Sequence, residues 1–229
     1  MSELIVVSCN ENERLRETLA YALEGVAFEW LTSAAALPRL AGKRVLFALG
    51  LSEHGLDVEV ISLIAMLRQN PAAMEGATGA ILLDGAGEQY TKQTGDMLAL
   101  AANLSGCRFP GKPLVEATGS LDNWNVQSLR RGVTLLGAYK QAARELVQRL
   151  IAFSPRKKER PNVLLLHASD HATSNTLRSG ARISEQISPY CEIREISLQN
   201  GAIFDCRGCS YKTCAHFARQ NSCFYGGVI

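Results

Sequence analysis

Short apolar runs alternate with helix-period segments along residues 1–155, and this alternation limits the fold more than any other feature of the chain. Five runs have the length and composition of strands. The third run is apolar enough to be buried on both faces, as in a parallel sheet. Strands are expected at 4–7, 28–31, 44–50, 80–84 and 113–117.

Between these runs, apolar residues recur near every 3.6 positions, which predicts helices. The helices are expected at 11–23, 58–68 and 94–104, with one long helix at 126–153. Strands that alternate with helices predict an α/β fold with a parallel sheet covered on both faces. Five such strands match the doubly wound, flavodoxin-like version of that fold.

A second unit begins after Pro155, where the charged run at 156–160 indicates a solvated linker. Residues 161–229 repeat the opening pattern of strand, polar loop, helix and strand, with the strands at 163–167 and 191–198 and the helix at 177–187. The predicted organisation is therefore a flavodoxin-like domain at 1–155, a linker at 156–160 and a partial second domain at 161–229.

Two parallel strands leave unpaired edges and do not make a core of their own. We therefore expect one of two situations for residues 161–229. Either the chain is a fragment of a longer protein, or its C-terminal strands complete a sheet with the first domain or with another subunit. The latter arrangement leads us to expect a homo-oligomer.

The composition excludes several classes of protein. Hydrophobic residues make up 47% and charged residues 20% of the chain, which is the balance of a globular protein rather than a disordered or fibrous one. The apolar runs are far shorter than the ~20 residues that span a bilayer. The formal net charge of +2 is too small to indicate a nucleic-acid or membrane partner. We expect a cytoplasmic protein that binds neither.

The polar loop at 168–176 is a candidate phosphate site. It lies between a predicted strand and the N-terminus of a predicted helix, where free N–H groups and the helix dipole favour an anion. Its hydroxyl and amide side chains add hydrogen-bond donors, and ligands of open α/β sheets bind at the carboxyl ends of strands. The alternative is an ordinary helix-capping loop, because Ser, Thr and Asn are common caps.

This loop and the cysteines that follow it resemble the NADPH-dependent FMN reductase family, including its iron–sulfur flavoprotein branch. The resemblance covers 161–229 and rests on Ser169, Ser174-Asn175-Thr176 and Cys206-Arg207-Gly208-Cys209. In that family the Ser/Asn/Thr loop holds the FMN phosphate, which assigns that role here to Ser169, Ser174, Asn175 and Thr176. The family continues for three further strands around the flavin ring, beyond the segments matched here.

The resemblance implies an oxidoreductase in which NAD(P)H reduces FMN and the electrons pass to a small-molecule or protein acceptor. In such an enzyme the protein positions and tunes the flavin, which supplies the chemistry. No residue is assigned as catalytic. Two other classes of protein stay open. One is a non-catalytic flavodoxin-like scaffold, and the other is an electron carrier without its own NAD(P)H site. In both, the cysteines would hold a structural metal.

Four of the seven cysteines cluster as C-x2-C-x4-C-x8-C, at Cys206, Cys209, Cys214 and Cys223. Four thiolates at short spacing suit zinc or a [4Fe–4S] cluster, and unmetallated structural or redox thiols are the third possibility. The iron–sulfur flavoproteins have only two residues between the second and third cysteines, whereas this chain has four. We expect nearby Arg207 and Lys212 to lower thiol pKa values.

The first domain offers a second candidate site at its own strand ends. Its first turn, at 8–13, carries two carboxylates that would repel a phosphate, so FMN is not expected there. Later turns at 84–92 and 116–124 contain glycines, hydrogen-bonding side chains and the rings of Tyr90 and Trp124, which are suited to a planar ligand. The alternative is that these are turn residues and half-buried aromatics.

Overall fold

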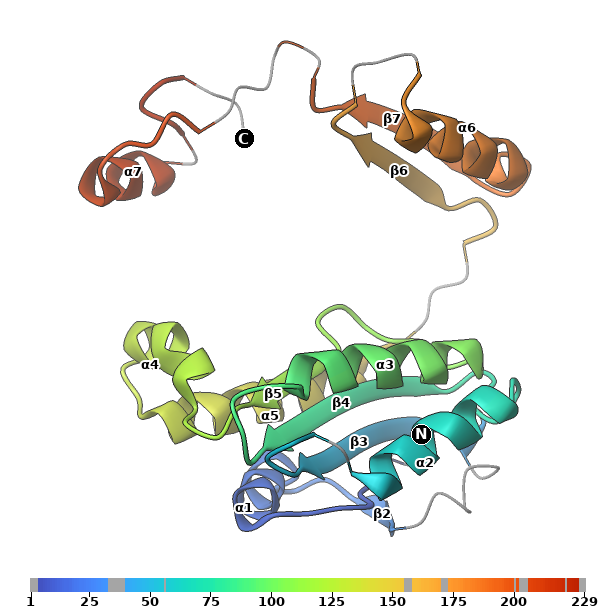
Figure 1. Ribbon diagram of the computed structural model, residues 1–229, viewed down its shortest axis with the longest axis vertical. Helices are drawn as coiled ribbons and strands as arrows, with labels where there is room; N and C mark the ends of the chain where they lie inside the picture. The colour runs from blue at the N-terminus through green and yellow to red at the C-terminus, as the bar shows by residue number, and fades with distance from the viewer. Residues whose placement is uncertain are drawn as a thin grey trace. The chain divides into compact units, whose positions relative to one another are not determined.

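The structure is a computed structural model that describes residues 4–32, 40–55, 57–154, 158–169, 173–199, 201, 206–220 and 222–226. Its contacts divide the chain into two compact units, Met1–Ser154 and Pro155–Ile229. Figure 1 colours the first unit from blue to yellow and the second from orange to red. Each unit is described by itself.

The first unit is built on a five-stranded, fully parallel sheet. Its strands are β1 (Leu4–Val7), β2 (Phe28–Leu31), β3 (Arg44–Leu51), β4 (Thr78–Gly85) and β5 (Leu114–Ala117). They lie in the order β2-β1-β3-β4-β5. This is the strand order of the doubly wound flavodoxin-like fold, so that prediction is confirmed.

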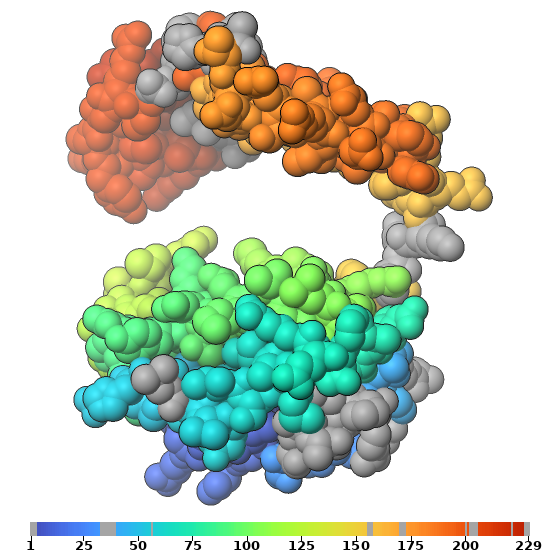
Figure 2. All heavy atoms as spheres, turned by 45° about the vertical axis from the view of Figure 1, so that its right-hand side comes forward, coloured from blue at the N-terminus to red at the C-terminus, as the bar shows by residue number. Residues whose placement is uncertain are grey.

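Two helices cover each face of this sheet. One face packs on α1 (Glu13–Ala22) and α5 (Leu135–Ala152), and the other on α2 (Val58–Gln69) and α3 (Thr91–Leu104). Successive residues of β3 alternate between the two layers: Phe47 joins the cluster with α2 and α3, whereas Leu46 joins the cluster with α1 and α5. Figure 2 shows α2 and α3 forming one continuous outer surface.

The predicted single helix at 126–153 is wrong, because two helices occupy this stretch. After a 3-10 turn (Asp122–Trp124), α4 (Asn125–Arg131) ends at Gly132, whose φ of 65° is left-handed. The next helix, α5, begins after Thr134, whose side chain accepts a hydrogen bond from the Gly137 N–H. A glycine with a left-handed φ ends the first helix, and the N-cap threonine that follows starts the second. Within the described residues, no helix is long and apolar enough to span a membrane.

The second unit contains a β-α-β arrangement, as predicted. Its elements are β6 (Asn162–His167), α6 (Asn175–Ile187) and β7 (Glu192–Ser197), followed by α7 (Tyr211–Ala218), which was not predicted. Strands β6 and β7 pair in parallel as a two-stranded sheet. Leu165 lies against Gly180 of α6, whereas Leu164 and Leu166 are more than half exposed.

Candidate functional site

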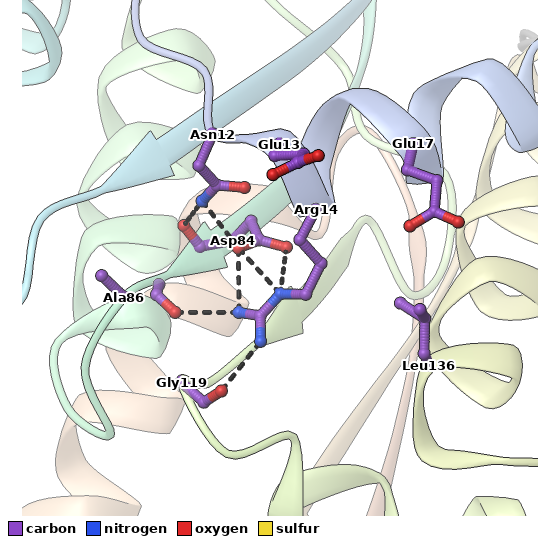
Figure 3. Close-up of a pocket in the computed structure, with 9 residues that line it drawn as sticks. Asn12, Glu13, Arg14, Glu17, Asp84, Ala86, Gly119 and Leu136 are labelled. Atoms are coloured by element: carbon purple, nitrogen blue, oxygen red, sulfur yellow. Dashed lines mark hydrogen bonds and ion pairs between the residues drawn. The ribbon is translucent and has the colours of Figure 1, made fainter.

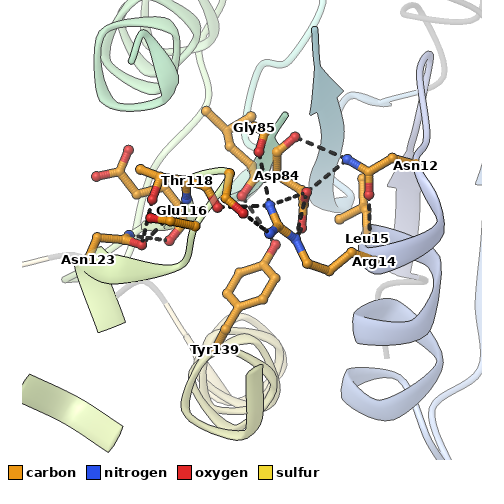
Figure 4. A network of polar contacts seen from close by, with 12 residues as sticks. Asn12, Arg14, Leu15, Asp84, Gly85, Glu116, Thr118, Asn123 and Tyr139 are labelled. Carbon is orange, nitrogen blue, oxygen red and sulfur yellow. Dashed lines mark hydrogen bonds and ion pairs between the residues drawn. The ribbon is translucent and has the colours of Figure 1, made fainter. Parts of the chain in front are cut away.

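The carboxyl end of the first sheet is occupied by the side chain of Arg14, which was not predicted. Arg14 lies in the first turn of α1 and extends over the end of β4 (Figure 4). Its Nε donates to both oxygens of Asp84 at 3.1 and 3.0 Å, and its Nη2 donates to Asp84 Oδ1 at 2.9 Å. Nη2 also donates to the carbonyls of Gly85 and Thr118, and Nη1 donates to the carbonyl of Gly119, each at 2.9 Å.

Asp84 is fully buried and is the acceptor around which these contacts gather. Asn12 Nδ2 also donates to its Oδ1 at 2.8 Å, while the Asn12 oxygen caps the N-terminus of α1. The buried Tyr139 of α5 lies beside this carboxylate, and its pKa is raised well above the ordinary value by burial first and by Asp84 second. The carboxylate is therefore neutralised and saturated by protein groups.

A pocket of about 540 Å³ adjoins this network (Figure 3). Its lining includes the carboxylates of Glu13 and Glu17, the side chain of Leu136 and the paired Arg14 and Asp84. Glu13 contributes negative charge, Glu17 is paired with Lys140 at 2.6 Å, and the Arg14 guanidinium is already paired with Asp84 and carbonyl groups. A phosphate would therefore meet repulsion rather than free donors here.

The turns at 84–92 and 116–124 meet each other, and their polar groups bond to the protein. Glu88 accepts hydrogen bonds from the Ser120 N–H at 2.6 Å and from its hydroxyl at 2.9 Å. These bonds lower the pKa of Glu88, with the backbone bond as the largest cause. A Cβ on Gly119 would collide with the Ala86 carbonyl, and one on Gly87 would lie 2.6 Å from the Glu53 carbonyl. The glycines thus allow close packing of loops.

The two aromatic residues of these turns do not form a stacking pair in the described contacts. Tyr90 precedes α3 with a left-handed φ of 72° and packs against Gly55. Trp124 lies with its ring centroid 5.8 Å from that of Tyr139 and donates its indole N–H to the Glu116 carbonyl at 2.9 Å. These contacts favour the interpretation of Trp124 as a half-buried turn residue, whereas Tyr90 is a turn residue that is 47% exposed.

In the second unit, Ser169, Ser174, Asn175 and Thr176 are brought to one end of α6, after the carboxyl end of β6. Ser174 is the N-cap of this helix, and its hydroxyl accepts from the Leu177 N–H at 3.4 Å. The same hydroxyl donates to Ser169 Oγ at 3.1 Å. Asn175 and Thr176 are the first two helical residues, whose N–H groups have no partner within the helix. Hydroxyl and N–H groups therefore converge at the predicted phosphate position.

These groups fit a phosphate monoester by the chemistry of their donors. The first turn of α6 contains no acidic residue, so the partial positive charge of the helix end is not offset there. Residues 170–172 of the same loop lie outside the described residues.

The four clustered cysteines are free thiols around α7. Within the residues that the structure describes, no three His, Cys, Asp or Glu side chains come together in a way that could hold a metal ion. The donor set for zinc or a [4Fe–4S] cluster is therefore not assembled. Cys209 and Cys214 are in contact, and the pKa of Cys209 is raised, by burial first and then by Cys214. The expected lowering by Arg207 and Lys212 is wrong for this thiol.

Sequence reasoning missed Arg14, Asn12 and Tyr139 at the first sheet. The available signal was Asp84 itself, because a carboxylate ending a continuously apolar strand needs a buried partner. Its partner is 70 residues away in the sequence, and no short motif connects them.

No protein-family model and no curated protein matches the sequence. Among solved structures, the chain is similar to a flavodoxin from Streptococcus pneumonia TIGR4, at 10% identity and a TM-score of 0.45. The match covers 65% of this chain and 99% of that one. The strand order of the first unit, rather than this likeness, assigns the fold.

Proposed function

We propose that the second unit binds FMN through its phosphate at the loop formed by 168–176. The chain would then act as an NAD(P)H-dependent flavin oxidoreductase, or as part of one, that passes electrons to a small-molecule or protein acceptor. The observation that supports this proposal is the convergence of Ser169, Ser174, Asn175 and Thr176 at the N-terminus of α6.

Each of these residues has a separate part in the proposal. The Ser169 and Ser174 hydroxyls face each other at 3.1 Å, and both can turn a proton toward an anion that enters between them. The backbone N–H groups of Asn175 and Thr176 supply donors aligned with the helix dipole, and the side-chain amide of Asn175 adds a further donor. Arg178, one turn further along the helix, adds a cation to the same helix end.

The contrast between the two units supports the second one as the flavin site. In the first unit, the turn after β1 directs Asn12 and Arg14 onto Asp84, so its donors are already bonded to the protein. In the second unit, the corresponding turn after β6 has hydroxyls that bond mainly to each other and to the helix end. An entering phosphate replaces such exchangeable bonds at little cost.

When bound, FMN supplies hydride acceptance and one- or two-electron transfer, which no side chain here provides. This chain's residues would bind the phosphate and thereby fix the position of the cofactor.

The test compares FMN with riboflavin, which lacks the phosphate. Fluorescence titration of the full chain should give tighter binding of FMN, and Asn175→Ala should weaken FMN binding about 5- to 10-fold, the loss of roughly one charge-assisted hydrogen bond. Riboflavin affinity should stay unchanged. Asn175→Ala is chosen because Ser174 still caps α6.

Ser188→Ala is the matched control, since Ser188 lies at the other end of α6 and its hydroxyl donates to the Glu185 carbonyl. It should leave the preference for FMN intact. Equal affinities for FMN and riboflavin in the unmodified chain would refute a phosphate site. Bleaching of the bound flavin by NADPH under anaerobic conditions tests the oxidoreductase part separately.

The alternative function is that of a non-catalytic scaffold or of an electron carrier. One observation in the first unit favours this alternative. Its crevice is filled by the Arg14–Asp84 network, as expected for a module that packs without a ligand. Bound FMN that NADPH does not bleach would favour the carrier. A chain that binds no flavin would favour the scaffold.

A further inference from the structure

Two cysteines occupy positions at the start of α7 whose side chains meet. Ser210 is the N-cap of this helix, and its hydroxyl accepts from the Thr213 N–H at 3.2 Å while its carbonyl accepts from the Cys214 N–H at 2.9 Å. Cys209 is therefore the residue before the cap, and Cys214 is the fourth residue of the helix. In many helices these two positions hold apolar side chains that pack together across the first turn.

The thiols of Cys209 and Cys214 make this contact. The Cys214 side chain interacts with the Cys209 thiol, and both Cys214 and Cys206 raise the pKa of that thiol. Gly208, between Cys206 and Cys209, has a left-handed φ of 69°. The capping bonds of Ser210 fix the pairing with Cys214, because they set the geometry of the turn that brings the two residues together.

We propose that Cys209 and Cys214 are a redox-active dithiol that closes to a disulfide across the first turn of α7. This proposal stands independently of flavin binding. It explains why two soft, oxidisable side chains replace the usual apolar pair at a helix start. Neither Cys206 nor Cys223 is part of the pair.

The reaction is thiol–disulfide exchange with a small-molecule disulfide, RSSR. Cys214 is exposed and Cys209 is half-buried, so the Cys214 thiolate attacks first, forming a Cys214–S–SR bond and releasing RS⁻. The Cys209 thiolate then attacks the Cys214 sulfur, forming the Cys209–Cys214 bond and releasing a second RS⁻. The two cysteines lose two electrons and two protons, and RSSR becomes two RSH.

Trypsin separates all four clustered cysteines, which makes the test direct. Cleavage after Arg194, Arg207, Lys212 and Arg219 places Cys206, Cys209, Cys214 and Cys223 on four different peptides. The full chain is equilibrated with mixtures of reduced and oxidised glutathione, quenched in acid, alkylated and digested. Mass spectrometry then identifies each disulfide by the two peptides it joins.

The expected result is one dominant cross-link, between the peptides at 208–212 and 213–219, which forms and disappears reversibly with the glutathione ratio. Cys206→Ser and Cys223→Ser should leave it unchanged within twofold in the midpoint ratio. Cys209→Ser should leave Cys214 as a mixed disulfide with glutathione, since the second step is blocked.

Three results would overturn the proposal. A dominant disulfide between Cys206 and Cys209 would show that the proposed pair is the wrong one. Absence of any cross-link at high oxidised glutathione, with the Thr213–Arg219 peptide still alkylated, would show that the thiols do not pair. Stoichiometric zinc or iron in the purified chain, with the four cysteines protected from alkylation until a chelator is added, would make them metal ligands.

Discussion

At the scale of single residues, Asp84 decides how the carboxyl end of the first sheet is built. A fully buried carboxylate is costly unless it is paired and hydrogen-bonded. Here Arg14 and Asn12 satisfy it, and the rest of the guanidinium binds three carbonyls from the neighbouring turns. One arginine thereby connects the start of α1, the end of β4 and the turn after β5.

This arrangement predicts that replacing Arg14 and replacing Asp84 lower the free energy of unfolding by different amounts. Arg14→Gln should lower the free energy of unfolding by about 3–5 kcal/mol, because it leaves a buried charge without its cation. Asp84→Asn should cost less, since the guanidinium is partly exposed and keeps its carbonyl partners. Urea unfolding followed by tryptophan fluorescence measures both, because Trp30 and Trp124 lie in the first unit.

The double variant completes this cycle. If Arg14 and Asp84 act as a unit, the loss of unfolding free energy in the double variant should be about 1–3 kcal/mol smaller than the sum of the two single losses. Costs that add within about 0.5 kcal/mol would show that the two side chains contribute independently, contrary to the network described.

Cys107 gives a prediction for the pH dependence of stability. Burial raises the pKa of its thiol to about 12, from the ordinary value of 9.0. Between these two values the unfolded thiol is ionised while the folded thiol keeps its proton. The contribution of the neutral Cys107 thiol to the free energy of unfolding is therefore fully present below pH about 9 and is lost as the pH rises toward 12.

Over pH 9–10.5, the free energy of unfolding of the unmodified chain should fall by up to about 1.4 kcal/mol per pH unit more than that of Cys107→Ala. This is the effect expected when the unfolded state releases one proton that the folded state keeps. The comparison of urea curves at several pH values cancels other titrating groups, such as Tyr139, that both proteins share. Parallel pH dependences would mean that the Cys107 thiol is not held neutral by the fold.

At the scale of elements, the break between α4 and α5 depends on Gly132. Its left-handed φ of 65° is unfavourable for a residue with a side chain, although nothing lies within 4 Å of the Cβ position. Gly132→Ala should therefore lower the free energy of unfolding by about 1 kcal/mol through backbone strain alone.

Gly111→Ala is its matched control, because that position also has open space but no left-handed φ. There the substitution should leave stability unchanged or raise it by less than about 1 kcal/mol, through the lower entropy of the unfolded chain. Equal effects at Gly132 and Gly111 in urea unfolding would contradict the role of the helix exit.

The sequence predicted the sheet well for a physical reason. Strands β1, β3 and β4 are buried along nearly their whole length, and the runs at 4–7 and 28–31 match β1 and β2 in full. Helix 126–153 was predicted as one element because apolar residues continue through Gly132 at helical spacing, yet Val126 and Leu129 of α4 are exposed. Periodicity alone does not distinguish a buried stripe from an exposed one.

The candidate sites were predictable only where the groups are close in the sequence. Ser174, Asn175 and Thr176 are adjacent, and a strand–loop–helix pattern places them together. The Arg14–Asp84 pair depends on the register of a folded sheet, which no local pattern encodes. The start of α7 was missed because the cysteine spacing suggested metal ligation, whereas Ser210 is the residue that positions Cys209 and Cys214.

At the scale of the whole molecule, the first unit contains its own core. Both buried clusters, one on each face of the sheet, are drawn entirely from residues of Met1–Ser154. We therefore expect residues 1–154, expressed alone, to unfold at the same urea midpoint as the full chain when tryptophan fluorescence is followed. A lower midpoint or a shallower transition would show that the second unit contributes to this core.

The filled crevice of the first unit also affects how ligands of this protein would be found. A ligand raises the melting temperature of the part it binds, by an amount that grows with its concentration over its dissociation constant. In the first unit the Arg14 guanidinium is already bonded to Asp84 and to three carbonyls, so these groups are not free to bind a cofactor. If the units unfold independently, a thermal-shift screen read by tryptophan would miss a cofactor of the second unit. Such a screen needs a probe placed at α6.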